Sequence, residues 1–155
     1  MPKVQNIIPL THDEALLRME RYCAYSERWP KEVRNKLTEF GLTGADNEQI
    51  FAVLGGDNFF NEERFAMAFA VGKFRNNYWG RVRIRQELWM RDIAPALITQ
   101  ALNSIDETEY VKLLQKLLDK KRAQYASAPN PREKAAASVI RAGFEMELVF
   151  LYWWD

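Results

Sequence analysis

The chain has 155 residues, which is enough for one ordinary domain or for a short array of small repeats. Its 22 Lys and Arg residues are balanced by 21 Asp and Glu residues, so the net charge alone indicates no particular partner. With 48% hydrophobic and 13% aromatic residues, the composition excludes disorder over most of the length.

Cysteine and histidine are too scarce for a disulfide framework or a metal cluster, because Cys23 and His12 are the single examples of each. A reducing compartment suits such a chain, and we expect a cytoplasmic protein without metal or cofactor. The N-terminus has no long apolar run after its early lysine, so we expect no signal peptide, and no stretch approaches the roughly 20 apolar residues of a membrane-spanning helix. We therefore expect no contact with a membrane.

Helical signals begin after a short N-terminal segment. Residues 1–10 hold two prolines and no helical period, so we expect a flexible lead-in there. Thr11 and Glu14 then form a capping box, in which each side chain accepts a hydrogen bond from the other residue's backbone. Pro30 opens the second predicted helix, and Gly41 provides a left-handed stop after it. A third helix completes this first cycle.

Two further cycles of three helices follow. Asn61 is predicted to cap the first helix of the second cycle, and Gly80 to open its second helix. Asp106 is predicted to cap the long first helix of the third cycle, whose other helices are expected at residues 134–142 and 145–154. The three predicted repeats are residues 11–58, 59–105 and 106–155.

Apolar residues in the second and third helices of the cycles, and just after the turn between them, recur at an interval of 51 residues. The triplets are Val33/Ile84/Ala135, Leu37/Leu88/Val139, Leu42/Ile93/Phe144, Ile50/Ala101/Tyr152 and Phe51/Leu102/Trp153. Five matches in register favour a repeated three-helix unit over chance. No strand-like alternation persists, so we predict an all-α fold of three tandem three-helix repeats that form an elongated, curved helical array.

Catalytic patterns are missing from the sequence. His12 is expected at the surface in a first helical turn, and Cys23 lies on an apolar stripe with no base nearby to activate it. No Gly-rich phosphate loop, metal-spaced ligand set or nucleophile elbow occurs. We predict that the protein is not an enzyme.

The middle repeat carries a cluster of basic residues. Between residues 73 and 92, Glu87 and Asp92 oppose six basic residues, which are Lys73, Arg75, Arg81, Arg83, Arg85 and Arg91. The turn that contains Trp79 is expected to place an aromatic ring beside these charges. Arginine forks and aromatic faces together suit phosphates and stacked bases. The alternative is a solvated face whose arginine stems cover the core.

Two other features are interpreted as structural. The first is a basic cluster in the C-terminal half of a long helix, where cations are favoured by the helix dipole; its residues are Lys116, Lys120, Lys121 and Arg122. The second is the apolar ending at residues 148–154, which is predicted to be a packed terminal helix. An exposed interaction patch is the alternative for that ending.

The central stretch resembles the core motif of the RecX family. The residues that carry the resemblance are Phe60-Asn61-Glu62-Glu63-Arg64-Phe65-Ala66, Lys73-x-Arg75, Trp79-Gly80-x-x-x-Ile84-x-x-x-Leu88 and Ile93. Weaker matches are Glu27-Arg28, Val33-Arg34-x-Lys36-Leu37 and Gly41 before it, and Ile105-Asp106, Tyr110 and Leu114 after it. Together they cover about residues 13–150. Of the central motif, we assign Phe65, Ala66, Ile84 and Leu88 to the core.

The resemblance implies a regulator of the bacterial recombinase RecA. RecX proteins bind the RecA–DNA filament and restrain its ATP hydrolysis, strand exchange and coprotease activity, which implies a role in DNA repair, recombination and the SOS response. Single- or double-stranded DNA is a further implied partner, no cofactor is implied, and a monomer is expected. By resemblance, the positions that face the partner are Lys73, Arg75, Arg81, Arg83 and Arg85.

Two other functions remain open from the sequence. One is a helical-repeat DNA-binding module that acts without a recombinase, although the near-neutral net charge argues against strong binding to DNA alone. The other is a scaffold that recognises another protein through a concave face.

Overall fold

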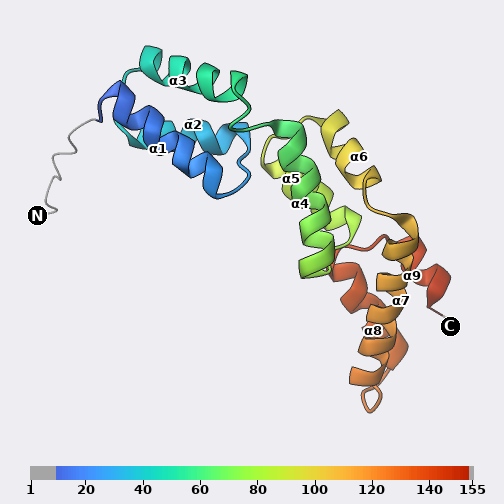
Figure 1. Cartoon of the computed structure of the whole chain (residues 1–155). Coiled ribbons are helices and arrows are strands. Elements are labelled where there is room, and N and C mark those ends of the chain that lie inside the picture. The colour runs from blue at the N-terminus through green and yellow to red at the C-terminus, as the bar shows by residue number, and fades with distance from the viewer. Residues whose placement is uncertain (1–9, 154–155) are drawn as a thin grey trace, which may run out of the picture. The chain divides into compact units, whose positions relative to one another are not determined.

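The computed structural model of the protein describes residues 10–153. In this range it contains nine helices and no strand, so the predicted all-α fold is confirmed (Figure 1). The chain divides into two compact units, Met1–Phe65 and Ala66–Asp155. The flexible lead-in predicted for residues 1–10 lies outside the described residues, apart from Leu10.

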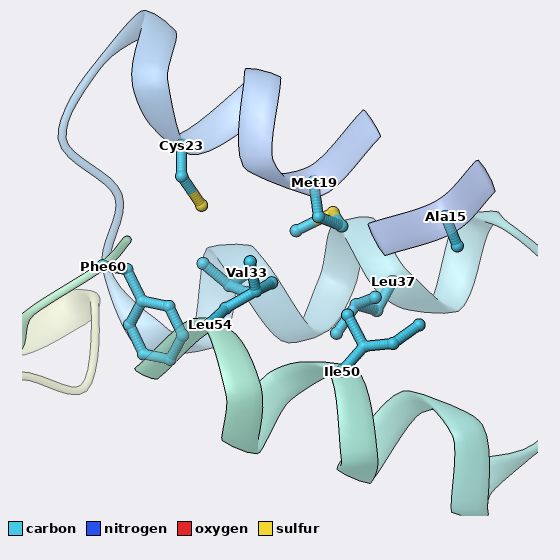
Figure 2. Packing of buried hydrophobic residues seen from close by; sticks show 8 residues of the cluster. All are labelled: Ala15, Met19, Cys23, Val33, Leu37, Ile50, Leu54 and Phe60. Carbon is cyan, nitrogen blue, oxygen red and sulfur yellow. The ribbon is translucent and has the colours of Figure 1, made fainter. Parts of the chain in front are cut away.

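The first unit contains three helices that pack pairwise around one apolar core. They are α1 (His12–Tyr25), α2 (Pro30–Glu39) and α3 (Gly44–Gly56). Each helix turns a stripe of apolar residues at helical spacing toward the other two, which is how short amphipathic helices become stable. The buried side chains shown in Figure 2 are Ala15, Met19, Cys23, Val33, Leu37, Ile50, Leu54 and Phe60.

The predicted start and stop signals of this unit are confirmed. Glu14 N donates to Thr11 Oγ1 at 3.2 Å, and Thr11 N donates to Glu14 Oε2 at 3.3 Å, which completes the capping box. Pro30 lies in the first turn of α2, and Gly41 follows that helix with a φ of 72°. Thr43 caps α3 in addition, because its Oγ1 accepts from an amide of the first turn.

The second unit contains most of α4 and all of the five helices that follow it. The helices are α4 (Glu62–Asn77), α5 (Arg81–Met90), α6 (Pro95–Asn103), α7 (Glu107–Gln124), α8 (Pro131–Arg141) and α9 (Met146–Tyr152). α7 lies beside α8, while α5 contacts α6 and α8 contacts α9 (Figure 1). Asn61 and Asp106 cap α4 and α7 as predicted, since each side chain accepts from the amide three residues later.

Two helix boundaries near the C-terminus differ from the prediction. α8 begins at Pro131, three residues before the predicted start, because proline suits a first helical turn, where its missing N–H is not needed. α9 begins at Met146 and is preceded by Glu145 as the N-cap residue. Of the predicted helix at residues 145–154, Trp154 lies outside the described residues.

The 51-residue interval marks matching core positions in α2, α5 and α8. The two triplets within these helices are buried in all three copies: Val33, Ile84 and Ala135, and Leu37, Leu88 and Val139. The core assignment of Phe65, Ala66, Ile84 and Leu88 is confirmed by their burial. The repeat boundaries and the curved shape of the array stay predictions.

The second unit is joined internally by two glycines at a close backbone contact. Gly80 N donates to Ala142 O, and Val82 N donates to Gly143 O, each at 2.9 Å. A Cβ atom on Gly80 would lie 2.3 Å from the backbone of Gly143 and of the next residue, Phe144. This contact ties the start of α5 to the turn between α8 and α9, and a side chain at position 80 cannot fit there.

Candidate partner-binding surface

The five predicted contact residues lie on α4 and α5, on either side of one tight turn. Lys73 and Arg75 belong to the last part of α4, and the three arginines belong to α5. Tyr78 in the turn has a φ of 59°, and Gly80 is the N-cap residue of α5. The turn therefore brings the C-terminal end of α4 and the first turns of α5 close together.

Two of the predicted cations lie close to the aromatic ring of Trp79. Lys73 Nζ lies 5.0 Å and Arg83 Cζ 4.0 Å from the centroid of the Trp79 ring. Phe69 extends the cluster, because its ring centroid lies 6.2 Å from that of Trp79 and 5.5 Å from Lys73 Nζ. A cation over an aromatic face is held in place electrostatically. The prediction that the turn places an aromatic ring beside the charges is confirmed.

Arg81 is engaged by groups of its own unit. Its Nε donates to Glu145 Oε2 at 3.0 Å, and its Nη1 donates to Glu107 Oε2 at 2.7 Å. Its guanidinium carbon lies 3.9 Å from the centroid of the Tyr110 ring, and its side chain is only 21% exposed. Because two carboxylates balance its charge, Arg81 acts first as a link from α5 to α7 and to the N-cap of α9.

Tyr110 lies at the centre of this link and is fully buried. Its hydroxyl accepts from Arg81 N at 3.0 Å and donates to Glu145 Oε1. Its ring packs against Phe74 and Phe144, with centroids 5.7 Å and 5.0 Å away. Burial raises the pKa of Tyr110 well above its ordinary value, and the hydrogen bond to Glu145 raises it further.

This raised pKa makes the stability of the protein depend on alkaline pH. Above about pH 10 the unfolded chain ionises its tyrosines, whereas folded Tyr110 keeps its proton. The free energy of unfolding should therefore fall as pH rises, by about 1.4 kcal/mol per pH unit for this one group. Urea unfolding between pH 9 and 11.5 measures the fall, and Tyr110→Phe should make it shallower. An equally steep fall in that variant would contradict this origin.

Arg75 and Arg85 are the two exposed members of the predicted set that do not contact Trp79. Arg75 Nη2 lies 3.5 Å from Glu109 Oε2, and both side chains are largely exposed. Arg85 makes no ion pair with any residue that the structure describes, so its charge faces solvent. Arg85 is thus the predicted residue best placed to meet a partner.

A hollow of about 390 Å³ lies along the exposed side of α5, next to Arg85. Its lining is mainly apolar and includes Trp89 and Met90, which are 68% and 59% exposed. Neither residue was predicted as a contact from the sequence, although they follow Arg85 by four and five positions. Their spacing could have revealed them, because Trp89 and Met90 do not share the helix face of the core residues Ile84 and Leu88.

The residues considered for catalysis have structural settings. Cys23 is buried as predicted, and burial raises the pKa of its thiol, which keeps it protonated and unreactive. His12, expected at the surface, is partly buried, and its Nδ1 lies 3.7 Å from Asp13 Oδ1. No group of three His, Cys, Asp or Glu residues in the described chain could hold a metal ion. None of the helices described is long and apolar enough to cross a membrane.

Comparison with known proteins identifies relatives of this chain. Residues 61–102, which hold α4, the turn, α5 and most of α6, match the family model described as "RecX, second three-helix domain". The chain is 27% identical to the regulatory protein RecX of Lactococcus lactis subsp. lactis strain IL1403 over 128 residues. It is 24% identical to that of Bacillus cytotoxicus over 138 residues. These matches span 79% and 88% of this chain but 47% and 51% of the relatives, so the chain spans about half their length.

Solved structures show the same fold. A crystal structure of regulatory protein RecX has a TM-score of 0.82 and 22% identity, and covers 93% of this chain and 72% of that one. The crystal structure of RecX from Lactobacillus salivarius also has a TM-score of 0.82, with 19% identity and coverage of 91% and 93%. The resemblance to RecX proteins predicted from the sequence is confirmed.

Proposed function

We propose that the protein is a RecX-type regulator that binds the RecA–DNA filament and inhibits its ATP hydrolysis, strand exchange and coprotease activity. The observation that carries this proposal is the match of residues 61–102 to the family model, because that stretch holds the predicted basic cluster. The protein would act as a cytoplasmic monomer in the regulation of DNA repair. Like the relatives named above, it would be a regulator. We propose that it is not an enzyme.

The proposed contact surface, here called the α4–α5 surface, combines charge with exposed apolar area. Its residues are Lys73, Arg75, Arg81, Arg83, Arg85, Trp89 and Met90. Arginine, tryptophan and methionine are enriched where proteins bind proteins, because they bury large area and still make directed polar contacts. Arg83 and Arg85 would meet acidic groups or phosphates, while Trp89 and Met90 would fill an apolar recess of the partner. Arg81 would contribute by holding α5 in place.

The proposal is tested on the recombinase reaction. Substoichiometric amounts of the protein should lower the single-stranded-DNA-dependent ATP hydrolysis of the RecA from the same organism, because one regulator bound to a filament affects many subunits. The rate of ATP hydrolysis by preformed filaments is measured as a function of the concentration of added protein. Unchanged hydrolysis at micromolar excess would rule the proposal out.

A paired variant locates the contact in the same assay. Arg85→Glu with Trp89→Ala should weaken inhibition at least about tenfold, because an exposed anchor and its neighbouring charge are lost together. The control, Arg21→Glu with Leu17→Ala, changes charge by the same amount on an exposed face of α1. If both variants inhibit equally well, the α4–α5 surface is not the contact.

A second candidate function is a DNA-binding module that acts without a recombinase. The arrangement of Lys73 and Arg83 around Trp79 favours it, since rings and cations together suit single-stranded nucleic acid. Fluorescence anisotropy with DNA alone, across a salt series, separates the two functions. Tight binding that weakens steeply with salt would favour the module, provided that ATP hydrolysis by RecA is unaffected.

A further inference from the structure

A second hollow in the Ala66–Asp155 unit lies where the end of α4 meets α7 and α8. Its volume is about 260 Å³, which is room for several water molecules of about 30 Å³ each and hence for a phosphate group. The residues that line it are Asn77, Tyr78, Leu117, Lys120, Lys121, Ser138, Val139 and Ala142. It contains none of the residues of the α4–α5 surface.

Two lysines give this hollow its charge. Lys120 and Lys121 make no ion pair with any described carboxylate, and Lys121 Nζ makes one hydrogen bond, to Gln124 Oε1 at 3.1 Å. The neighbouring Arg122 differs, because it pairs with Asp119 and donates to the Tyr152 and Trp153 carbonyls. The helix-dipole role predicted for this basic cluster suits Lys121 and Arg122, which lie in the last turn of α7, but Lys120 and Lys121 have no charge partner of their own among the described carboxylates.

The ends of two helices also bear on the charge of the hollow. α4 and α8 both end beside it, and helix C-termini carry about half a negative charge each. Ala142 O, at the end of α8, already accepts the amide of Gly80. Two full positive charges outweigh these partial charges, so the hollow remains attractive to an anion.

Tyr78 has a left-handed backbone conformation. This conformation is higher in free energy for a residue with a bulky side chain than for asparagine or glycine. Its φ is 59°, and the other described residues with positive φ are Asn58, Asp92, Asn130 and two glycines. Asparagine, aspartate and glycine tolerate this region, whereas an aromatic residue there is an outlier. Tyr78 is also 50% exposed, and its ring stacks on no described aromatic ring. Among the described residues, the Tyr78 side chain makes no hydrogen bond or ring contact that would explain a tyrosine at this position.

We propose that this hollow is a subsite for single-stranded nucleic acid. One backbone phosphate is held by Lys120 and Lys121, with the Ser138 hydroxyl and the Asn77 amide as further donors. The adjoining base stacks on the exposed ring of Tyr78, which any base can do because every base has a π-face. The subsite needs no recombinase and stands whether or not the protein inhibits RecA.

Anisotropy of a fluorescent oligothymidine, without recombinase and across a salt series, tests the stacking half of the subsite. Tyr78→Asn should weaken binding about tenfold, the typical loss for one stacked base. The same variant should be at least as stable as the natural protein in urea, since asparagine tolerates the left-handed turn. Loss of binding with retained stability separates recognition from folding. Unchanged affinity would overturn the stacking role.

The lysines are tested by the slope of log affinity against log salt. Lys120→Ala with Lys121→Ala should make the slope shallower by about 0.7, because the two lysines hold one phosphate and each lost phosphate contact on a single strand removes about 0.7. The control is Arg18→Ala with Arg21→Ala on α1, which removes the same charge from an exposed face. The control should keep the slope of the natural protein.

Other outcomes overturn the subsite and identify the alternative. Equal losses in the lysine variant and the α1 control would show that only net charge matters. Loss in the lysine variant without loss in Tyr78→Asn would indicate phosphate contacts alone, as with a duplex. A lysine variant that binds DNA normally but inhibits RecA poorly would assign the hollow to an acidic protein surface. Failure of the natural protein to inhibit RecA would contradict the proposed function and leave these DNA measurements intact.

Discussion

Gly80→Ala is expected to lower the free energy of unfolding by about 3 kcal/mol or more. The added Cβ would lie 2.3 Å from Gly143 C and O and from Phe144 N, and these are backbone atoms that cannot rotate away. Making room would break the bonds from Gly80 N to Ala142 O and from Val82 N to Gly143 O. The backbone at Gly80, with φ −80° and ψ 168°, suits alanine, so the loss is steric.

Urea unfolding followed by circular dichroism measures this loss, with Gly72→Ala as the matched control. Gly72 lies inside α4, and a Cβ there would meet nothing within 4 Å. Alanine should therefore stabilise the helix by about 0.5–1 kcal/mol. Gly80→Ala and Gly72→Ala should move the unfolding midpoint in opposite directions. A Gly80→Ala protein as stable as the control would disprove the close contact between the start of α5 and the α8–α9 turn.

Arg81→Glu is expected to destabilise the protein by about 2–3 kcal/mol, whereas Arg85→Glu should change stability by no more than about 0.5 kcal/mol. The first substitution removes the bonds to Glu107 and Glu145 and places a third carboxylate beside them. Because Glu107 is largely exposed, part of this repulsion is screened, and the effect stays below that of a fully buried pair. Arg85 makes no ion pair in the described chain, so its reversal breaks none there.

The two charge reversals are compared by urea unfolding at low and high salt. The loss in Arg81→Glu should shrink at high salt, because repulsion among exposed carboxylates is screened. Equal stability of the two variants would contradict the structural role assigned to Arg81. This comparison also decides which variant is suitable for binding tests. Loss of inhibition in Arg81→Glu could come from destabilisation or from a lost contact, whereas loss of inhibition in Arg85→Glu reports on the contact alone.

Local signals were sufficient to predict most of the fold. Thr11, Asn61 and Asp106 are helix caps as predicted, because capping depends on a side chain and an amide only three residues apart. Gly41 has a positive φ where a stop was expected. The recurrence of apolar residues at an interval of 51 residues also predicted core positions, since burial of a helix face repeats with the unit.

The chemistry of the candidate surfaces depends on contacts between residues distant in the chain. Arg81 and Arg85 look equivalent in the sequence, yet Glu107 and Glu145 neutralise only Arg81, because folding brings α7 and the start of α9 to one end of α5. Lys120 lies 42 residues from Tyr78, and the two line one hollow. Spacing within one helix cannot reveal such neighbours.

The sequence by itself determined where most of the helices begin and end, which residues occupy the repeated core positions and which family the chain resembles, because these follow from local hydrogen bonds and from periodic apolar faces. Only the tertiary structure decided which cations are paired inside the fold and which remain available to a partner. That distinction depends on charge partners and aromatic rings supplied by other helices, and their distances are set by packing.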